Sequence, residues 1–180
     1  MSEQDENKLI SQRREKLDAI RSERQAFPNE FARQHIAAEL HTLCDGKSKT
    51  ELEELALGTA IAGRIVRMRG PFVVIKDASG QIQLYMNNKS FSEGLARELK
   101  SLDLGDIIGV KGEVFKTGKD ELSVRVAGFK LLTKSLRPLP DKYRGFTDTE
   151  ARYRRRYVDL IVNEESRTVF ETRSRIIGFI

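Results

Sequence analysis

The chain has 180 residues, of which 33% are charged and 39% hydrophobic, and its formal net charge is +5 at pH 7. This length allows one large domain or two small ones, and the composition is that of a soluble globular protein. No apolar run approaches the roughly 20 residues of a membrane-spanning helix, so we expect no membrane partner. The acidic, polar start and the single cysteine, Cys44, argue against a secretory leader and an internal disulfide, and predict a cytoplasmic protein.

Residues 1–56 are expected to form a helical extension. Their apolar residues recur at helical spacing but form only narrow stripes, such as the one through Leu17 and Ile20. Such stripes cannot hold an independent bundle together, so we expect these helices to pack on the next part of the chain. The predicted helices cover residues 6–25, 36–44 and 51–55.

Residues 57–134 alternate apolar and polar side chains in five segments, the pattern of half-buried strands. The expected strands are 58–69, 72–77, 81–86, 106–115 and 121–126, and a helix is expected over 91–99. Gly63 suits the bend that a small barrel requires of its first strand. Three strands, a helix and a two-strand hairpin are the order of the OB-fold, so the predicted fold class is an all-β, five-stranded OB-fold barrel with flanking helices.

Residues 135–180 differ in character and are expected to form a linker and the start of a further domain. Arg137-Pro138-Leu139-Pro140 predicts a stiff connector. Thr147 and Glu150 have the spacing of a capping box, and helical patterning continues over 152–162 and from 164 onward. The chain ends without a helix-ending signal, so we expect it to continue in a longer protein.

The second and third strands direct their side chains to two different faces. In the second strand Val73 and Ile75 point to the barrel interior, which leaves Phe72 on the outer face. In the third strand the same alternation places Gln83 and Tyr85 outside. An exposed Phe beside an amide stabilises a fold poorly but is suited to stack on and read an unpaired base.

OB-folds bind oligonucleotides on strands two and three and through the loops that join strands one–two and four–five. Phe72 follows the first of these loops and Glu121 follows the second, with Gln83 on the face between them. The Phe ring can stack on a base, and the amide can pair with the O4 and N3–H of uracil. An ionised Glu accepts hydrogen bonds only. The three residues together predict binding of a short pyrimidine-containing single strand, with uracil favoured.

The basic residues concentrate in the predicted barrel, where residues 57–134 carry 13 basic and eight acidic side chains. Arg67 and Arg69 lie at its rim and are candidates to contact phosphates or a base edge. Purely structural interpretations remain open for each candidate residue. The two arginines could form a solvated strand edge, Phe72 could be covered by the N-terminal helices, and Glu121 could simply pair with Lys119.

Other chemistry finds little support in the sequence. His35, His41 and Cys44 lack a fourth ligand and match no zinc spacing, and nothing resembles a nucleophile with its base, so no metal site and no catalytic residue are predicted. The run Arg152-Tyr153-Arg154-Arg155-Arg156-Tyr157 resembles a basic patch with interleaved aromatic residues. On a helix these arginines spread around the cylinder, which favours a role in domain packing over contact with nucleic acid.

Two stretches carry a family resemblance. They are Leu131-Leu132-Thr133-Lys134-Ser135-Leu136-Arg137-Pro138-Leu139-Pro140-Asp141-Lys142 and, after Gly145, Asp148-Thr149-Glu150-Ala151-Arg152-Tyr153-Arg154-Arg155-Arg156-Tyr157-Val158-Asp159-Leu160-Ile161. With them the chain closely resembles the N-terminal part of bacterial class II lysyl-tRNA synthetases, from its first helix to Ile180. The related aspartyl and asparaginyl enzymes share the barrel but not this connector.

The resemblance implies that the barrel binds the anticodon of lysine tRNA, whose central base is uracil. The positions matching Phe72 and Gln83 serve that uracil in the family, and the position matching Glu121 serves the first anticodon base. The turn between strands one and two is several residues shorter here than the usual family loop, which carries an additional base-reading arginine. Arg67 and Arg69 are the candidates for that part.

The resemblance also implies that the ATP- and lysine-binding core lies beyond Ile180. The parent enzyme would use ATP and magnesium to charge lysine tRNA and would be a homodimer. This chain alone is expected to bind no cofactor, to be inactive, and to be a monomer or weak dimer. Two other functions stay open from the residues themselves: a non-specific single-strand-binding module, and a structural OB domain without a nucleic-acid role.

Overall fold

The computed structural model describes residues 3–140 and 148–180. The chain forms two compact units, Met1–Pro138 and Leu139–Ile180. Among the helices within these described ranges, none combines the length and the apolar character that crossing a bilayer requires.

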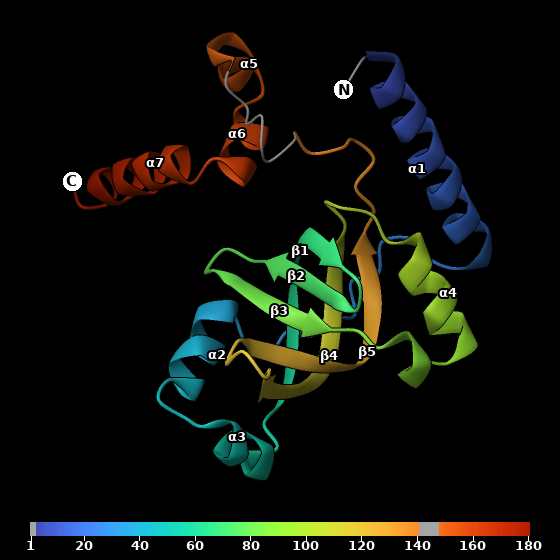
Figure 1. Cartoon of the computed structure of the whole chain (residues 1–180). Coiled ribbons are helices and arrows are strands. Elements are labelled where there is room, and N and C mark those ends of the chain that lie inside the picture. Colours follow the sequence, from blue (N-terminus) through green and yellow to red (C-terminus); the bar gives the residue numbers. More distant parts are fainter. Residues whose placement is uncertain (1–2, 141–147) are drawn as a thin grey trace. The chain divides into compact units, whose positions relative to one another are not determined.

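Five strands of the first unit close into a barrel (Figure 1). Closure follows because β1 pairs with both β2 and β4, which gives the order β1-β2-β3-β5-β4. The strands are β1 (Gly58–Arg69), β2 (Phe72–Lys76), β3 (Gln81–Tyr85), β4 (Ile107–Lys116) and β5 (Leu122–Thr133). A 3₁₀ turn, η1 (Asn88–Ser90), and the helix α4 (Glu93–Ser101) separate β3 from β4 in the chain. The predicted OB-fold, an all-β core with flanking helices, is confirmed.

The barrel interior is filled by alternate side chains of every strand. Val73 and Ile75 of β2, and Ile82 and Leu84 of β3, are at most 2% exposed, as the alternation predicts. The core also takes in side chains of the other three strands, of α2 and of α3. The remaining fully buried large residues are Leu40, Leu52, Ile61, Ile65, Met86, Ile108, Val110, Val114 and Leu131. Because the apolar half of each strand is used inside, the other half is available on the outer face.

The first strand bends where it passes from β4 to β2. Residues up to Arg64 pair with β4, and residues from Arg64 onward pair with β2, with a register shift between Ile65 and Arg67. Gly63 lies at this crossing, where an added Cβ would be 3.0 Å from the carbonyl oxygen of Lys76. The backbones approach so closely that a side chain at this position would require the Lys76 backbone to shift, which supports the role predicted for this glycine.

The fifth strand is longer than predicted. The sequence indicated an end at residue 126, but β5 continues to Thr133. The ladder with β4 shifts register where Lys111 faces Gly128 and Gly112 faces Val126. This bulge breaks the two-residue alternation, so Phe129 and Leu131 return to the interior out of phase with Val126. The sequence pattern fails there because the side-chain period changes while the strand itself continues.

Three helices precede the barrel: α1 (Glu3–Glu23), α2 (Ala37–Cys44) and α3 (Lys49–Leu55). The backbone N–H of Ala37, at the start of α2, donates to a carboxylate oxygen of Asp77 at 2.8 Å. Leu17 of α1, Leu40 of α2 and Leu52 of α3 are at most 3% exposed. The α2 helix also buries Ala37 and Cys44, so its buried face is the widest of the three.

A cluster of charges is buried where α1, the start of β4 and the end of β5 meet. The Lys134 Nζ donates to Asp106 at 2.6 Å and to Asp103 at 2.5 Å, and the side chains of Lys134 and Asp106 are both 0% exposed. Lys16 of α1 donates to Asp103 at 2.8 Å, and Arg13 of α1 donates to the backbone oxygen of Ser135 at 2.9 Å. The cluster thus ties the N-terminal helix to the segment that leaves the barrel.

The second unit contains three helices, α5 (Thr149–Arg154), α6 (Arg156–Val162) and α7 (Glu164–Ile177). The N-cap of α5 is Asp148, whose carboxylate accepts from the Glu150 backbone N–H at 3.1 Å, whereas Thr147 lies outside the described residues. The helix predicted over 152–162 is interrupted at Arg155 (φ −118°, ψ 52°), where α5 ends and α6 begins.

Two arginines of the Arg-Tyr run serve to pack the second unit. Arg152 donates to the carboxylate of Asp159 at 3.0 Å, and Arg156 binds its other oxygen. The Asp159 side chain is 0% exposed. The Arg156 guanidinium also lies 4.7 Å from the ring centroid of Tyr153 and 5.0 Å from that of Phe170. These contacts agree with the packing role favoured from the sequence.

Removing the charge of Lys134 should destabilise the protein strongly. In Lys134→Met the volume is largely kept, but Asp106 remains buried without its cation, and we expect a loss of about 3–5 kcal/mol in the free energy of unfolding. Urea titration measures this loss. Lys130→Met in β5 is the matched control, because the side chains of Lys130 and its partner Glu30 are exposed at the surface. Equal unfolding midpoints for the two variants would contradict the role given to the buried cluster.

Stability should also fall in acid through Asp103. Burial raises the pKa of its carboxyl, but the hydrogen bonds and positive charges of Lys134 and Lys16 outweigh burial and lower the pKa overall. The unfolded chain, with a carboxyl pKa of about 3.9, then binds more protons than the folded one as the pH drops below about 5. Asp103→Asn should therefore be less stable than the wild type near neutral pH, and the gap should shrink toward pH 3. Parallel pH profiles in urea unfolding would exclude this contribution.

Candidate nucleic-acid interface

The predicted site residues Phe72 and Gln83 lie on neighbouring strands of one outer face. In the β2–β3 ladder Phe72 stands opposite Tyr85, and Val74 stands opposite Gln83. Phe72 and Gln83 are therefore diagonal neighbours, and both are half-buried. The face is the one that the alternation predicted.

A row of aromatic side chains crosses this face. The rings of Phe72 and Tyr85 have centroids 5.4 Å apart, and those of Tyr85 and Phe115 are 6.2 Å apart at 74°. The Arg125 guanidinium lies 4.8 Å from the Phe115 centroid. The row thus extends from β2 through β3 to the ends of β4 and β5. Such half-buried rings with one open side are suited to stacking on unpaired bases.

A chain of hydrogen bonds joins the positions of Gln83 and Glu121. The Gln83 Nε2 donates to the Ser123 Oγ at 2.9 Å, and that hydroxyl donates to the backbone oxygen of Glu121 at 3.2 Å. Ser123 is 0% exposed. The parallel pairing of β3 with β5 sets Gln83 opposite Ser123 in register. The two predicted base-reading residues, distant in sequence, are therefore brought together by this serine.

Glu121 lies in the β4–β5 turn, one residue before β5, and not at the beginning of the strand as predicted. Its backbone is fixed by Thr117, whose side chain accepts from the Glu121 N–H at 3.2 Å and whose own N–H donates to the Glu121 oxygen at 3.0 Å. Among the described residues near this turn, Lys116 at the end of β4 forms an ion pair with Asp120 at 3.3 Å. The pairing of Glu121 with Lys119 that the sequence left open is not observed. The exposed Glu121 carboxylate can therefore accept a hydrogen bond from a ligand.

Arg67 and Arg69 follow the same face onto β1. In the β1–β2 ladder Arg67 stands opposite Val74, and Arg69 stands opposite Phe72. Both are exposed. Arg64 differs from them, because its guanidinium donates to the backbone oxygen of Gly105 at 2.8 Å and so has a structural role. Arg67 and Arg69 are thus placed beside the aromatic row with their charges directed to solvent.

The connection between β1 and β2 is short. β1 ends at Arg69 and β2 begins at Phe72, so the turn consists of Gly70 and Pro71. Gly70 adopts φ +56°, a left-handed conformation that favours glycine. This tight turn holds Arg69 directly beside Phe72.

The helix α2 meets the β2–β3 hairpin away from Phe72. The contacts of α2 are with Asp77, with Ser79 at 3.0 Å and with the backbone oxygen of Gln81 at 3.0 Å. These residues form the turn at the opposite end of the β2–β3 hairpin from Phe72. The alternative that α2 covers the Phe72 ring is therefore not supported.

Three residues of this face were not singled out from the sequence: Ser123, Phe115 and Arg125. The alternation in β4 and β5 does place all three outside, and that signal was available. The sequence did not indicate which residues lie beside these three, because the pairing of β3 with β5 arises only when the barrel closes. The site therefore includes residues whose type alone gave no indication.

Other candidate chemistry is weaker. Cys44 is 2% exposed, and burial raises the pKa of its thiol, which disfavours the reactive thiolate. Within the described ranges, no group of three or more His, Cys, Asp or Glu side chains is placed to hold a metal ion.

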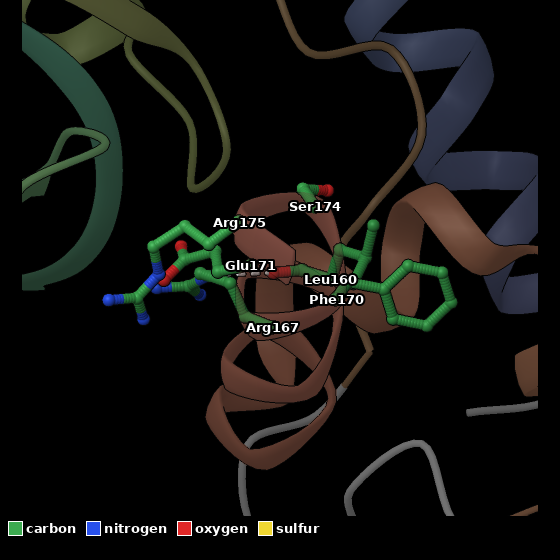
Figure 2. A pocket seen from close by; sticks show the side chains of 6 residues that line it. All are labelled: Leu160, Arg167, Phe170, Glu171, Ser174 and Arg175. Carbon is green, nitrogen blue, oxygen red and sulfur yellow. Dashed lines mark hydrogen bonds between the residues drawn. The ribbon is translucent and has the colours of Figure 1, made fainter. Parts of the chain in front are cut away.

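An open depression of about 560 Å³ lies on α6 and α7 of the second unit (Figure 2). Its lining residues are Leu160, Arg167, Phe170, Glu171, Ser174 and Arg175. The Arg167 guanidinium donates to the backbone oxygens of Leu160 and Ile161 at 3.1 and 3.2 Å. This arginine of α7 therefore binds the end of α6 and has a structural role. We assign no catalytic role to the residues that line the depression.

Comparison with known proteins identifies relatives of the barrel and of the whole chain. Residues 59–132 match the family described as OB-fold nucleic acid binding domain. A lysine–tRNA ligase of Chromohalobacter salexigens is 54% identical, and the match covers 99% of this chain and 37% of that protein. Those of Ectopseudomonas mendocina and Pseudomonas aeruginosa are 52% and 51% identical over 98% and 99% of this chain. The chain spans little more than a third of the length of these relatives.

Proposed function

The chain belongs to the lysine–tRNA ligase family, and from this premise we propose that its barrel binds the anticodon loop of a lysine tRNA. The observation that carries the proposal is the convergence of Phe72, Gln83 and Glu121 on one face, joined through Ser123. A single-stranded loop presents splayed bases, and this face offers stacking and hydrogen bonding side by side.

The central base of the anticodon is assigned to Phe72 and Gln83. A base stacked on the Phe72 ring places its hydrogen-bonding edge over β3, where the Gln83 amide can accept from the N3–H of uracil. Cytosine has no hydrogen on N3, so it would meet the same oxygen with an acceptor. The first anticodon base is assigned to Glu121, whose carboxylate accepts from a ring or amino N–H. Arg67 and Arg69 contact phosphates or a base edge.

The complete protein is a class II lysine–tRNA ligase that charges lysine tRNA in the cytoplasm and works as a homodimer. The activation of lysine requires ATP and magnesium. The described residues contain no group of metal-ligating side chains, and the sequence has no glycine-rich phosphate loop. No ATP or magnesium site and no step of the reaction is assigned to the described residues. The isolated chain is inactive and a monomer or weak dimer.

The proposal is tested by titrating the chain with two anticodon stem-loops, one with UUU and one with UCU, at low salt. We expect the UUU loop to bind more tightly than the UCU loop. Phe72→Ala should weaken the binding of both loops by about 1–3 kcal/mol, because stacking on the ring is lost. Phe27→Ala is the matched control, because Phe27 is 41% exposed and lies outside the barrel face. Amide chemical shifts should change around Phe72, Gln83 and Glu121.

The outcomes separate the remaining functions. Equal affinity for poly-U and poly-A, with a steep salt dependence as the main feature, would replace the proposal by non-specific single-strand binding. If Phe72→Ala left every RNA affinity unchanged, the barrel would instead be a structural domain.

Replacing Gln83 should change specificity more than affinity. Gln83→Ala removes the amide that meets the central base, so we expect the preference for UUU over UCU to narrow while the UCU loop binds nearly as before. Gln81→Ala is the matched control, with the same residue type on the same strand and face but near α2. Fluorescence anisotropy with both loops measures the ratio. An unchanged ratio in Gln83→Ala would remove this residue from central-base recognition.

A further inference from the structure

We propose that Ser123 is a positioning residue that fixes the orientation of the Gln83 amide and thereby makes the site selective for uracil over cytosine. The inference rests on the proposed anticodon binding and deepens it. Ser123 itself touches no base, because its side chain is 0% exposed beneath the neighbouring side chains of the outer face.

The position of Ser123 is unusual for a serine. Its neighbours in β5, Leu122 and Val124, point into the core and are 8% and 0% exposed. Alternation therefore directs the Ser123 hydroxyl to the outer face, where Gln83 of β3 and Phe115 of β4 stand opposite it on either side. A buried hydroxyl between two strands must find its partners there.

Counting hydrogens fixes the direction of each bond. A serine hydroxyl has one hydrogen, and here that hydrogen is directed to the backbone oxygen of Glu121. The lone pairs of Oγ are then left to accept, and the Gln83 Nε2 supplies the hydrogen at 2.9 Å. If the amide rotated by 180°, its oxygen would face Oγ, and the hydroxyl could bond it only by giving up Glu121. The observed orientation forms two hydrogen bonds and the reversed one forms a single bond.

The orientation of the amide determines which base it reads. With Nε2 held by Ser123, the Gln83 Oε1 accepts no hydrogen bond from a described residue and is available to a ligand. Uracil offers a hydrogen at N3 to this oxygen, whereas cytosine offers a lone pair at N3. An amide free to rotate could turn its N–H to cytosine and accept both pyrimidines. Ser123 thus excludes cytosine by preventing that rotation.

The test compares the wild-type chain with S123A, using the UUU and UCU stem-loops. We expect the ratio of the two dissociation constants to narrow about fivefold in S123A, mainly because the UCU loop binds more tightly. S123T keeps a hydroxyl and should retain the wild-type ratio. In the Gln83→Ala background S123A should narrow the ratio no further, since the amide it orients is absent.

The outcomes distinguish this inference from the proposed function. If the wild type prefers the UUU loop and S123A prefers it by the same ratio, the inference is overturned and anticodon binding is left intact. A wild type that binds neither loop overturns both. If Ser123 had only a structural role, S123A would weaken the binding of both loops by the same factor and leave the ratio of their dissociation constants unchanged.

Hydrogen exchange of the Gln83 side chain tests the inference on the wild type alone, so it does not depend on whether S123A folds. The Gln83 side-chain NH₂ group should give two separate resonances, with one hydrogen protected from exchange by its bond to Ser123. The Gln81 side chain, on the same strand, should exchange rapidly. Equally rapid exchange at both residues would show that Ser123 does not hold the Gln83 amide.

Discussion

Closure of the five strands is the constraint on which the other features depend. Because β1 pairs with both β2 and β4, the ring has an inside and an outside, and each strand must divide its side chains between them. The apolar halves of the strands make the core. The candidate side chains of Phe72 and Gln83 are thereby directed to the outer face.

The parallel pairing of β3 with β5 assembles the site on that face. It sets Gln83 beside Ser123 and Tyr85 beside Arg125, residues separated by about 40 positions in sequence. The pairing joins the strand that carries the amide to the turn that carries Glu121. A rigid framework of this kind would hold the proposed base-reading groups in place before a ligand arrives, which reduces the entropy lost on binding.

The buried charges at the other end of β5 have a different role. Lys134 follows the last residue of β5, and its ammonium bridges Asp103 and Asp106 at the start of β4. Lys16 and Arg13 bring α1 to the same place. Lys134 and Asp106 are removed from solvent and require partners, and through them the cluster links α1 and the end of β5 to the start of β4. The acidic and basic residues that compose it look ordinary in the sequence.

The sequence by itself determined the barrel, the order of its elements and the face on which Phe72 and Gln83 lie, because alternation with a period of two is a local property. It could not determine where β5 ends, since the bulge near Gly128 changes that period. It also missed the break at Arg155, on either side of which Arg152 and Arg156 bind the carboxylate of Asp159. Only the tertiary structure placed Ser123 between Gln83 and Glu121, because strand pairing across a closed ring depends on the whole barrel.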